Sequence, residues 1–199
     1  DIVGITESWT SDCIDNDELA ISGYDMFRCD RAINKGGGGV LLYVREELQA
    51  LQIETRTNFP EHVWCKIRCA KGTELLIGVC YRTPTEHVYG HENHIRLREL
   101  LHEVEGSKVL LMGDFNYAKI DWDDHQCMPG ASGNARLFLN CVEDGFWTQN
   151  VKIKTREEAL LDLVLTTEAD CIESVTSLGW LEDSDHSLLQ WEINTEVEM

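Results

Sequence analysis

Short apolar runs of strand length recur along the whole chain, and they constrain its fold more than any other feature. Seven such runs lie between turn-forming residues, and each is too short for an ordinary helix. Helix-like segments separate some of them, at about residues 92–105 and 131–144, with a shorter one around residues 16–21. The strand-like runs are residues 2–6, 39–44, 62–68, 73–80, 108–112, 161–166 and 188–193.

The order of these elements predicts the fold class. Strands outnumber helices and are joined sometimes by turns and sometimes by one helix, which fits two packed sheets better than one doubly wound sheet. We therefore expect an α/β fold, namely a four-layer α/β/β/α sandwich of two packed mixed β-sheets flanked by helices. No internal repeat, low-complexity tract or linker divides the chain, so residues 1–199 are expected to form a single domain.

The cysteines and the hydropathy of the chain indicate its compartment. None of the eight cysteines forms a Cys-x-x-Cys pair, and several lie within apolar strand-like runs. We expect them to be reduced thiols of an intracellular protein. The sequence contains no run of about 18 or more apolar residues and no basic head typical of a signal peptide, so no membrane association is expected.

The formal net charge of −19 limits the possible ligands. It argues against a protein that grips nucleic acid through a broad basic surface, because neutralisation of phosphates dominates such binding. Carboxylates that hold a divalent cation would reverse the local charge where a phosphate must sit. The remaining negative charge predicts weak, salt-sensitive binding to any polyanion.

Polar residues follow the apolar run that begins at Lys108. Asp114 and Asn116 come directly after its last residues, Met112 and Gly113, and they share one side of the chain. Polar groups at the end of a strand are typical of a functional site. Gly-Asp-x-Asn is also ordinary turn chemistry, and that alternative stays open at this point.

Three further acidic positions are also candidates for a functional site. Asp185 and His186 precede an apolar run, and a carboxylate beside an imidazole suits metal binding and proton transfer, although a solvated loop is the alternative. Asp162 lies within an apolar strand, where an unpaired charge would be costly, so it requires either a partner such as histidine or a solvent-facing position. Glu7 ends the first apolar run and says little by itself.

Six motifs in this order resemble those of the endonuclease/exonuclease/phosphatase family and span nearly the whole chain. Within that family, residues 22–28, 63–67 and 113–122 are similar to the endonuclease domains of non-LTR retrotransposons. The family begins with a strand that ends in Asn, so the resemblance implies that the first strand is missing from residues 1–199. The six motifs are Thr-Glu-Ser-Trp at 6–9, Gly-Gly-Gly-Val at 37–40, Tyr-Arg-Thr-Pro at 81–84, Gly-Asp-Phe-Asn at 113–116, Leu-Asp-Leu-Val at 161–164 and Ser-Asp-His at 184–186.

The resemblance implies a metal site and a set of catalytic groups. Glu7 would bind the catalytic Mg²⁺, with Asp185 completing the metal region; Mn²⁺ is an alternative ion. Asp114 would orient or activate the attacking water, and Asn116 would hold the scissile phosphate.

The remaining catalytic groups would act on the phosphate. His186 would contact it or transfer a proton while Asp162 keeps the imidazole basic. Tyr81 would donate a hydrogen bond to a non-bridging oxygen.

Substrate contacts are predicted at two further places. Arg28 and Arg31, with Lys35, precede a run of glycines and could meet a DNA backbone, although a solvated turn fits equally well. Trp122 could stack on a base or enter a groove, whereas packing in the core is the commoner fate of a tryptophan.

The resemblance thus implies a magnesium-dependent phosphodiesterase that nicks DNA as part of a retrotransposon polyprotein. Its partner would be DNA, and the expected protein is a nuclear monomer, normally fused to a downstream reverse transcriptase. Two alternatives remain. The same fold could act on a phosphoinositide, sphingolipid, nucleotide or other small phosphodiester, or the chain could be an impaired copy that serves as a binding module.

Overall fold

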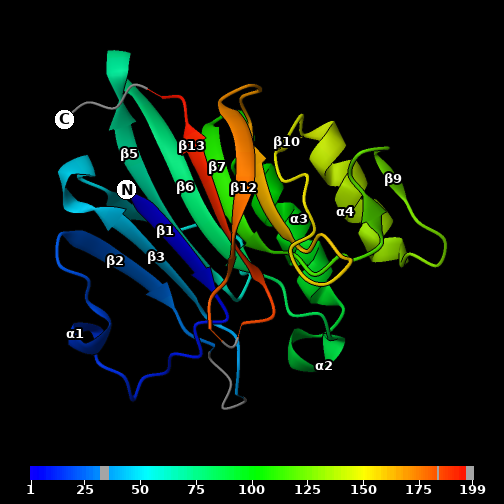
Figure 1. The fold of residues 1–199 in the computed structure, drawn as a ribbon, viewed down its shortest axis with the longest axis horizontal. Coiled ribbons are helices and arrows are strands. Elements are labelled where there is room, and N and C mark those ends of the chain that lie inside the picture. Colours follow the sequence, from blue (N-terminus) through cyan, green and yellow to red (C-terminus); the bar gives the residue numbers. More distant parts are fainter. Residues whose placement is uncertain (32–35, 183, 196–199) are drawn as a thin grey trace.

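The computed structural model of this chain describes residues 1–31, 36–182 and 184–195, so Lys35 lies outside the described residues (Figure 1). Its largest element is a six-stranded sheet in the order β10-β11-β7-β6-β5-β4. The pair β6 and β7 is parallel, and the other neighbouring pairs are antiparallel. The strands are β4 (Leu51–Ile53), β5 (His62–Cys69), β6 (Thr73–Tyr81), β7 (Lys108–Asp114), β10 (Thr148–Gln149) and β11 (Asp162–Thr166).

A smaller sheet and a hairpin pack against one face of the large sheet. The small sheet has the order β1-β3-β2, and the hairpin joins β12 to β13. Side chains from all three units form one buried cluster, which includes Leu42 of β3, Ile77 of β6 and Ile172 of β12. The elements are β1 (Ile2–Thr6), β2 (Tyr24–Cys29), β3 (Val40–Arg45), β12 (Ile172–Trp180) and β13 (Ser187–Ile193).

Two helices cover the opposite face of the large sheet. Helices α3 (Glu92–Glu103) and α4 (Gly133–Asp144) bury Leu100 and Phe138 in a second cluster with Leu111 of β7. In Figure 1 these helices and the small sheet lie on opposite sides of the view. Ser132 caps α4 by accepting a hydrogen bond from the backbone of Ala135. The remaining short elements are α2 (Glu86–Tyr89), β8 (Ile120–Asp121), β9 (Gln126–Cys127) and two 3₁₀ turns, Glu46–Leu48 and Ala70–Gly72.

The outer face of the small sheet is covered by the segment around α1 (Asn16–Leu19). Leu41 and Tyr43 point away from the inter-sheet core and are nevertheless buried, and the Tyr43 hydroxyl donates to the Leu19 carbonyl at 2.8 Å. The predicted α/β sandwich is therefore confirmed. The large sheet is mixed, the described small sheet is antiparallel, and one outer layer is a short segment instead of a long helix.

All seven predicted strands are present, with ends within two residues of those expected. Strand β12 was not predicted, because most of its side chains are exposed and its sequence lacks a continuous apolar run. Strand β2 also escaped prediction, because Asp25 and Arg28 interrupt its apolar residues and leave no continuous apolar run.

All eight cysteines are free thiols. No helix of the described ranges combines the length and apolar character needed to cross a bilayer.

Candidate active site

Three neighbouring strands of the large sheet bring polar side chains to one edge. Strands β6 and β7 are parallel and end together, so Tyr81 lies beside Asp114. Strand β11 runs antiparallel to β7 and begins at this edge, where Asp162 lies opposite Asp114. Residues far apart in sequence thus become neighbours through strand pairing alone.

Gly113 allows β7 to approach β6 closely just before the site. Its φ is +149°, and a Cβ at this position would lie 1.8 Å from the carbonyl oxygen of Cys80. Only glycine fits such an approach. The glycine of the Gly-Asp-Phe-Asn motif therefore sets the separation of Asp114 from Tyr81.

Asp114 is a buried carboxylate at this edge, with 4% of its surface exposed. Asn116 donates to it twice, from its backbone nitrogen to Oδ1 at 2.9 Å and from Nδ2 to Oδ2 at 2.7 Å. Burial raises the pKa of Asp114 to about 7, with Asp162 adding to the rise and His186 opposing it. Such a carboxylate can accept a proton near neutral pH.

Asp162 pairs with His186, which supplies the partner that an acid in an apolar strand requires. His186 Nδ1 lies 2.7 Å from Asp162 Oδ2. This hydrogen bond raises the pKa of His186 above its usual value, although burial opposes it. The imidazole is thereby oriented and its cationic form is favoured.

Thr155 ties the two strands that carry this pair. Its buried hydroxyl accepts hydrogen bonds from the backbone nitrogens of Leu161 and Asp162, at 3.0 and 3.1 Å. Its carbonyl accepts from the backbone nitrogen of Ser187 at 2.7 Å. No sequence pattern indicated this role, because a single threonine in a polar loop has no distinguishing pattern.

Glu7 lies next to Tyr81 at the end of β1. The Tyr81 hydroxyl and the Trp9 indole nitrogen both donate to its carboxylate, the latter at 2.9 Å. Burial first, and then the contact with Glu7, raises the pKa of Tyr81, so the phenol remains a hydrogen-bond donor. Glu7 has a left-handed backbone (φ +52°), and the backbone nitrogens of the two residues after it donate to the carbonyls of Gly39 and Gly38.

Asp185 lies at the rim of the site. Its side chain is exposed and forms an ion pair with Arg156 at 2.5 Å. Its Oδ1 is 4.0 Å from His186 Nε2. The structure therefore places Asp185 beside His186.

Arg82 is a buried cation that the sequence analysis did not single out. Its guanidinium donates to the carbonyls of Phe115, Thr83 and Asn116 and lies 4.1 Å from the centre of the Tyr117 ring. In return, Asn116 Nδ2 donates to the Arg82 carbonyl at 3.0 Å. Arg82 thus holds the Gly-Asp-Phe-Asn loop, where Asn116 adopts a left-handed conformation (φ +55°). The sequence feature that could have identified Arg82 is its position directly after Tyr81 in the Tyr-Arg-Thr-Pro motif.

The two arginines predicted to contact substrate instead form ion pairs with carboxylates of the protein. Arg28 pairs with Asp30 and donates to the carbonyls of Ile14 and Ser11. Arg31 makes a two-pronged ion pair with Glu61, which is fully buried.

Trp122 packs edge-on against Phe138 of the helical core, with 6.3 Å between ring centres. This is the core packing that the sequence analysis gave as the alternative to contact with a base.

A metal ion fits the chemistry of the donors at the strand edge. Asp114, Asp162 and His186 each offer a ligand atom, and these atoms lie within 4.8 Å of one another. Two carboxylates and one imidazole suit a divalent cation, with the oxygens favouring Mg²⁺ and the nitrogen making Mn²⁺ equally plausible. Glu7 and Asp185, which the resemblance assigned to the metal, lie outside this cluster.

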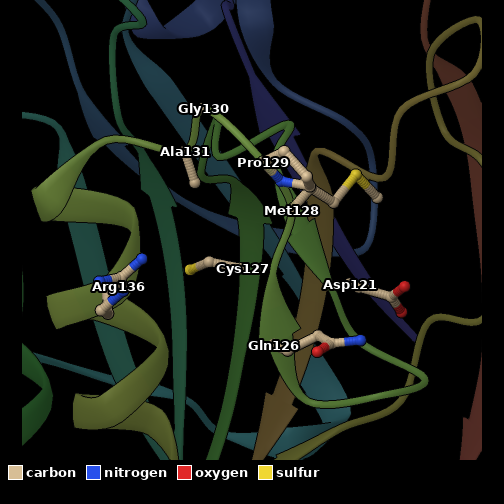
Figure 2. A pocket seen from close by; sticks show the side chains of 8 residues that line it. All are labelled: Asp121, Gln126, Cys127, Met128, Pro129, Gly130, Ala131 and Arg136. Atoms are coloured by element: carbon tan, nitrogen blue, oxygen red, sulfur yellow. The ribbon is translucent and has the colours of Figure 1, made fainter.

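A separate cavity of about 450 Å³ lies between the β8–β9 hairpin and α4 (Figure 2). Figure 2 shows Arg136 on the helix and Asp121 and Gln126 on the other side of the cavity. None of the strand-edge residues described above lines it.

The fold is one shared by phosphodiesterases, and the sequence comparison agrees. The chain belongs to the endonuclease/exonuclease/phosphatase family, whose sequence profile matches residues 1–186. Members of this family are generally hydrolytic nucleases or phosphatases that use divalent metals. No curated protein sequence matches the chain significantly.

Solved structures share the fold at low sequence identity. The endonuclease domain of TRAS1, a telomere-specific non-LTR retrotransposon, superposes with a TM-score of 0.68 at 13% identity, over 97% of this chain and 85% of that one. The catalytic domain of Xenopus laevis APE2 gives 0.69 at 15% identity, over 99% and 84%. A family member from Leptotrichia buccalis gives 0.61 at 14% identity, over 98% and 87%.

Proposed function

We propose that this protein is a divalent-metal-dependent phosphodiesterase that nicks DNA. The observation that carries the proposal is the convergence of Asp114, Asp162 and His186 at one sheet edge, with Asn116 fixing the buried carboxylate. These groups match the needs of phosphodiester hydrolysis, which are a base for water, neutralisation of charge on phosphorus, and help for the leaving oxygen.

Asp114 would act as the base. Water attacks phosphorus and transfers its proton to the Asp114 carboxylate, whose pKa of about 7 suits operation near neutral pH. The bond from phosphorus to the leaving oxygen breaks as the new bond forms. His186, held by Asp162 and favoured as a cation, would contact the phosphate and supply a proton.

Asn116 and Tyr81 would position these groups and the phosphate. Both hydrogens of the Asn116 amide are engaged, by Asp114 and by the Arg82 carbonyl, so this side chain orients the base. The Tyr81 hydroxyl points at Glu7 and can turn its hydrogen bond to a phosphate oxygen.

Mg²⁺ or Mn²⁺ would neutralise charge on the phosphate when bound. The candidate ligands are the Asp162 carboxylate of the strand-edge cluster, together with Glu7 and Asp185, which leaves Asp114 and His186 free for proton transfer.

The biological setting follows from the resemblance to retrotransposon endonucleases. The TRAS1 domain shares the fold over most of its length, which supports this assignment. On this proposal the chain is a monomeric nuclear domain whose parent protein carries a reverse transcriptase downstream.

A plasmid assay tests the proposal. Purified protein is incubated with supercoiled plasmid and Mg²⁺, with Asp114→Ala, an EDTA arm, and a version extended by an N-terminal strand that ends in Asn. Asp144→Ala serves as the matched control, because it removes an exposed carboxylate at the end of α4. We expect metal-dependent conversion to the nicked circle, lost in Asp114→Ala and retained in Asp144→Ala.

An intact plasmid would instead point to another substrate. If a folded, extended form leaves the plasmid intact, DNA cleavage is wrong for this protein. The strongly negative charge would then favour small substrates, and phosphoinositides and nucleotides would be the next compounds to test.

A further inference from the structure

Two tryptophans stand exposed beside the candidate active site. Trp9 follows β1 and has 67% of its surface exposed, and Trp180 ends β12 and has 69% exposed. Tryptophan is rarely left so open, because burying its ring is strongly favourable. Both lie within a few residues of a predicted catalytic group, Glu7 and His186 respectively.

Each indole is held at its edge by one hydrogen bond. Trp9 Nε1 donates to the Glu7 carboxylate at 2.9 Å, and Trp180 Nε1 donates to the Ser187 hydroxyl at 3.2 Å. A ring tethered through its nitrogen has a restricted orientation while its surface remains open to solvent. Such rings are preorganised to receive a flat partner.

A continuous series of contacts joins the two rings through the site. Trp9 bonds to Glu7, Glu7 to Tyr81, and Tyr81 lies beside Asp114. From there, Asp114 lies opposite Asp162, which bonds to His186, and the next residue, Ser187, pairs with Trp180 across the β12–β13 hairpin. The tryptophans therefore occupy the two ends of the row of catalytic candidates.

The arginines that the structure describes around the site are held by other groups of the protein. Arg31, Arg82 and Arg156 are each engaged by protein carbonyls or carboxylates. The whole chain carries a net charge of −19. Binding driven by phosphate neutralisation would be weak here, so affinity for nucleic acid must come from another source.

We propose that Trp9 and Trp180 stack on unpaired bases on either side of the scissile phosphate, so that the preferred substrate is single-stranded or locally unpaired DNA. Paired bases within a duplex hide their faces in the stack, whereas an unpaired base offers its face to an aromatic ring. This inference rests on the proposed function and names its substrate class.

Binding without cleavage provides the test. A labelled single-stranded oligonucleotide and a hairpin duplex of the same sequence are titrated with protein in EDTA, and fluorescence anisotropy is followed. The variants are Trp9→Ala, Trp180→Ala and their Phe counterparts. Phe146→Ala is the matched control, because Phe146 is 87% exposed and lies in the loop after α4, away from the row of contacts.

We expect the single strand to bind at least about fivefold more tightly than the duplex. Stacking on one base contributes on the order of 1–3 kcal/mol, so each Ala variant should weaken single-strand binding by about five- to 150-fold. The Phe variants should retain most of the affinity, and Phe146→Ala should bind like the wild type. Equal affinity for both DNA forms, or Ala variants that bind as the wild type does, would overturn the inference.

Plasmid nicking separates this inference from the proposed function. If plasmid nicking persists and the Ala variants bind single strands as tightly as the wild type does, the stacking inference is refuted and the proposed nuclease function stands. Tight, Trp-dependent single-strand binding by a protein that cuts neither DNA form refutes the nuclease and leaves the stacking site standing.

Discussion

Asp114 is held in a buried position where its charged form is disfavoured, and this has a measurable consequence for stability. Because its pKa rises to about 7 on folding, the folded protein binds more protons than the unfolded chain between about pH 4 and 7. The contribution of Asp114 to the free energy of unfolding therefore falls as pH rises through this window.

Asp114→Asn should remove this pH dependence. We expect the stability of the variant relative to wild type to increase by roughly 2 kcal/mol from pH 5 to pH 8, because the wild type must ionise a buried carboxyl group. Urea unfolding in EDTA at several pH values measures the difference. A constant difference across this range would show that Asp114 ionises as freely as an exposed carboxylate.

Asp162→Asn should lower the pKa of His186 and slow the reaction. The hydrogen bond from His186 to the Asp162 carboxylate favours the imidazolium, and an amide in its place would not. NMR titration of the ring protons should show the lower pKa, and the nicking rate should fall by about a hundredfold. An unchanged His186 pKa would mean that this pair does not control the imidazole in solution.

At the scale of elements, the site depends on how the loop after β7 is fastened to the loop after β6. Arg82 makes this connection through three carbonyl groups, and no carboxylate bonds to its guanidinium in the described part of the chain. Its cation instead faces the ring of Tyr117. Substitution should therefore disturb the loop that carries Asn116.

Arg82→Met should destabilise the fold by about 2–4 kcal/mol, because it leaves buried carbonyls without donors. Arg82→Lys should recover part of this loss, since an ammonium group donates to some of these carbonyls but lacks the planar fork. Urea unfolding gives the stability, and plasmid nicking by the folded fraction gives the activity. A Met variant within about 0.5 kcal/mol of wild type would contradict the role assigned to Arg82.

For the whole molecule, the net charge of −19 opposes compaction and favours cation binding. The folded state gathers Asp114, Asp162 and His186, whereas the unfolded chain keeps them apart. A divalent cation should therefore bind the folded state preferentially and stabilise it.

Millimolar Mg²⁺ or Mn²⁺ should raise the Tm of wild type more than NaCl of equal ionic strength does. Saturation should add roughly 1–3 kcal/mol, and the excess over NaCl should shrink in Asp162→Asn, which loses a ligand charge. Differential scanning fluorimetry measures both effects, with Asp144→Ala as the control. Equal shifts for both salts would indicate screening of the overall charge and no specific site.

Several elements of this molecule were predictable because residues close together in the sequence determine them. Strand β7 and its polar end follow from an apolar run that stops at Gly113, and the need of Asp162 for a partner follows from its apolar neighbours. The apolar periodicity of α3 and α4 likewise places their buried faces. Half-exposed strands such as β12 carry too weak a pattern for the same reasoning.

The tertiary structure alone decided which of these pieces meet. Asp162 bonds to a histidine 24 positions away, and the Glu7 and Tyr81 side chains, 74 positions apart, come into contact. Strand order and register set these distances, and they arise from burial on both faces of the large sheet and backbone pairing between distant segments. The same packing engaged Arg28, Arg31 and Arg82 within the protein and left Trp9 and Trp180 open. Sequence thus determined which groups can do chemistry, and packing decided which of them are free to touch a substrate.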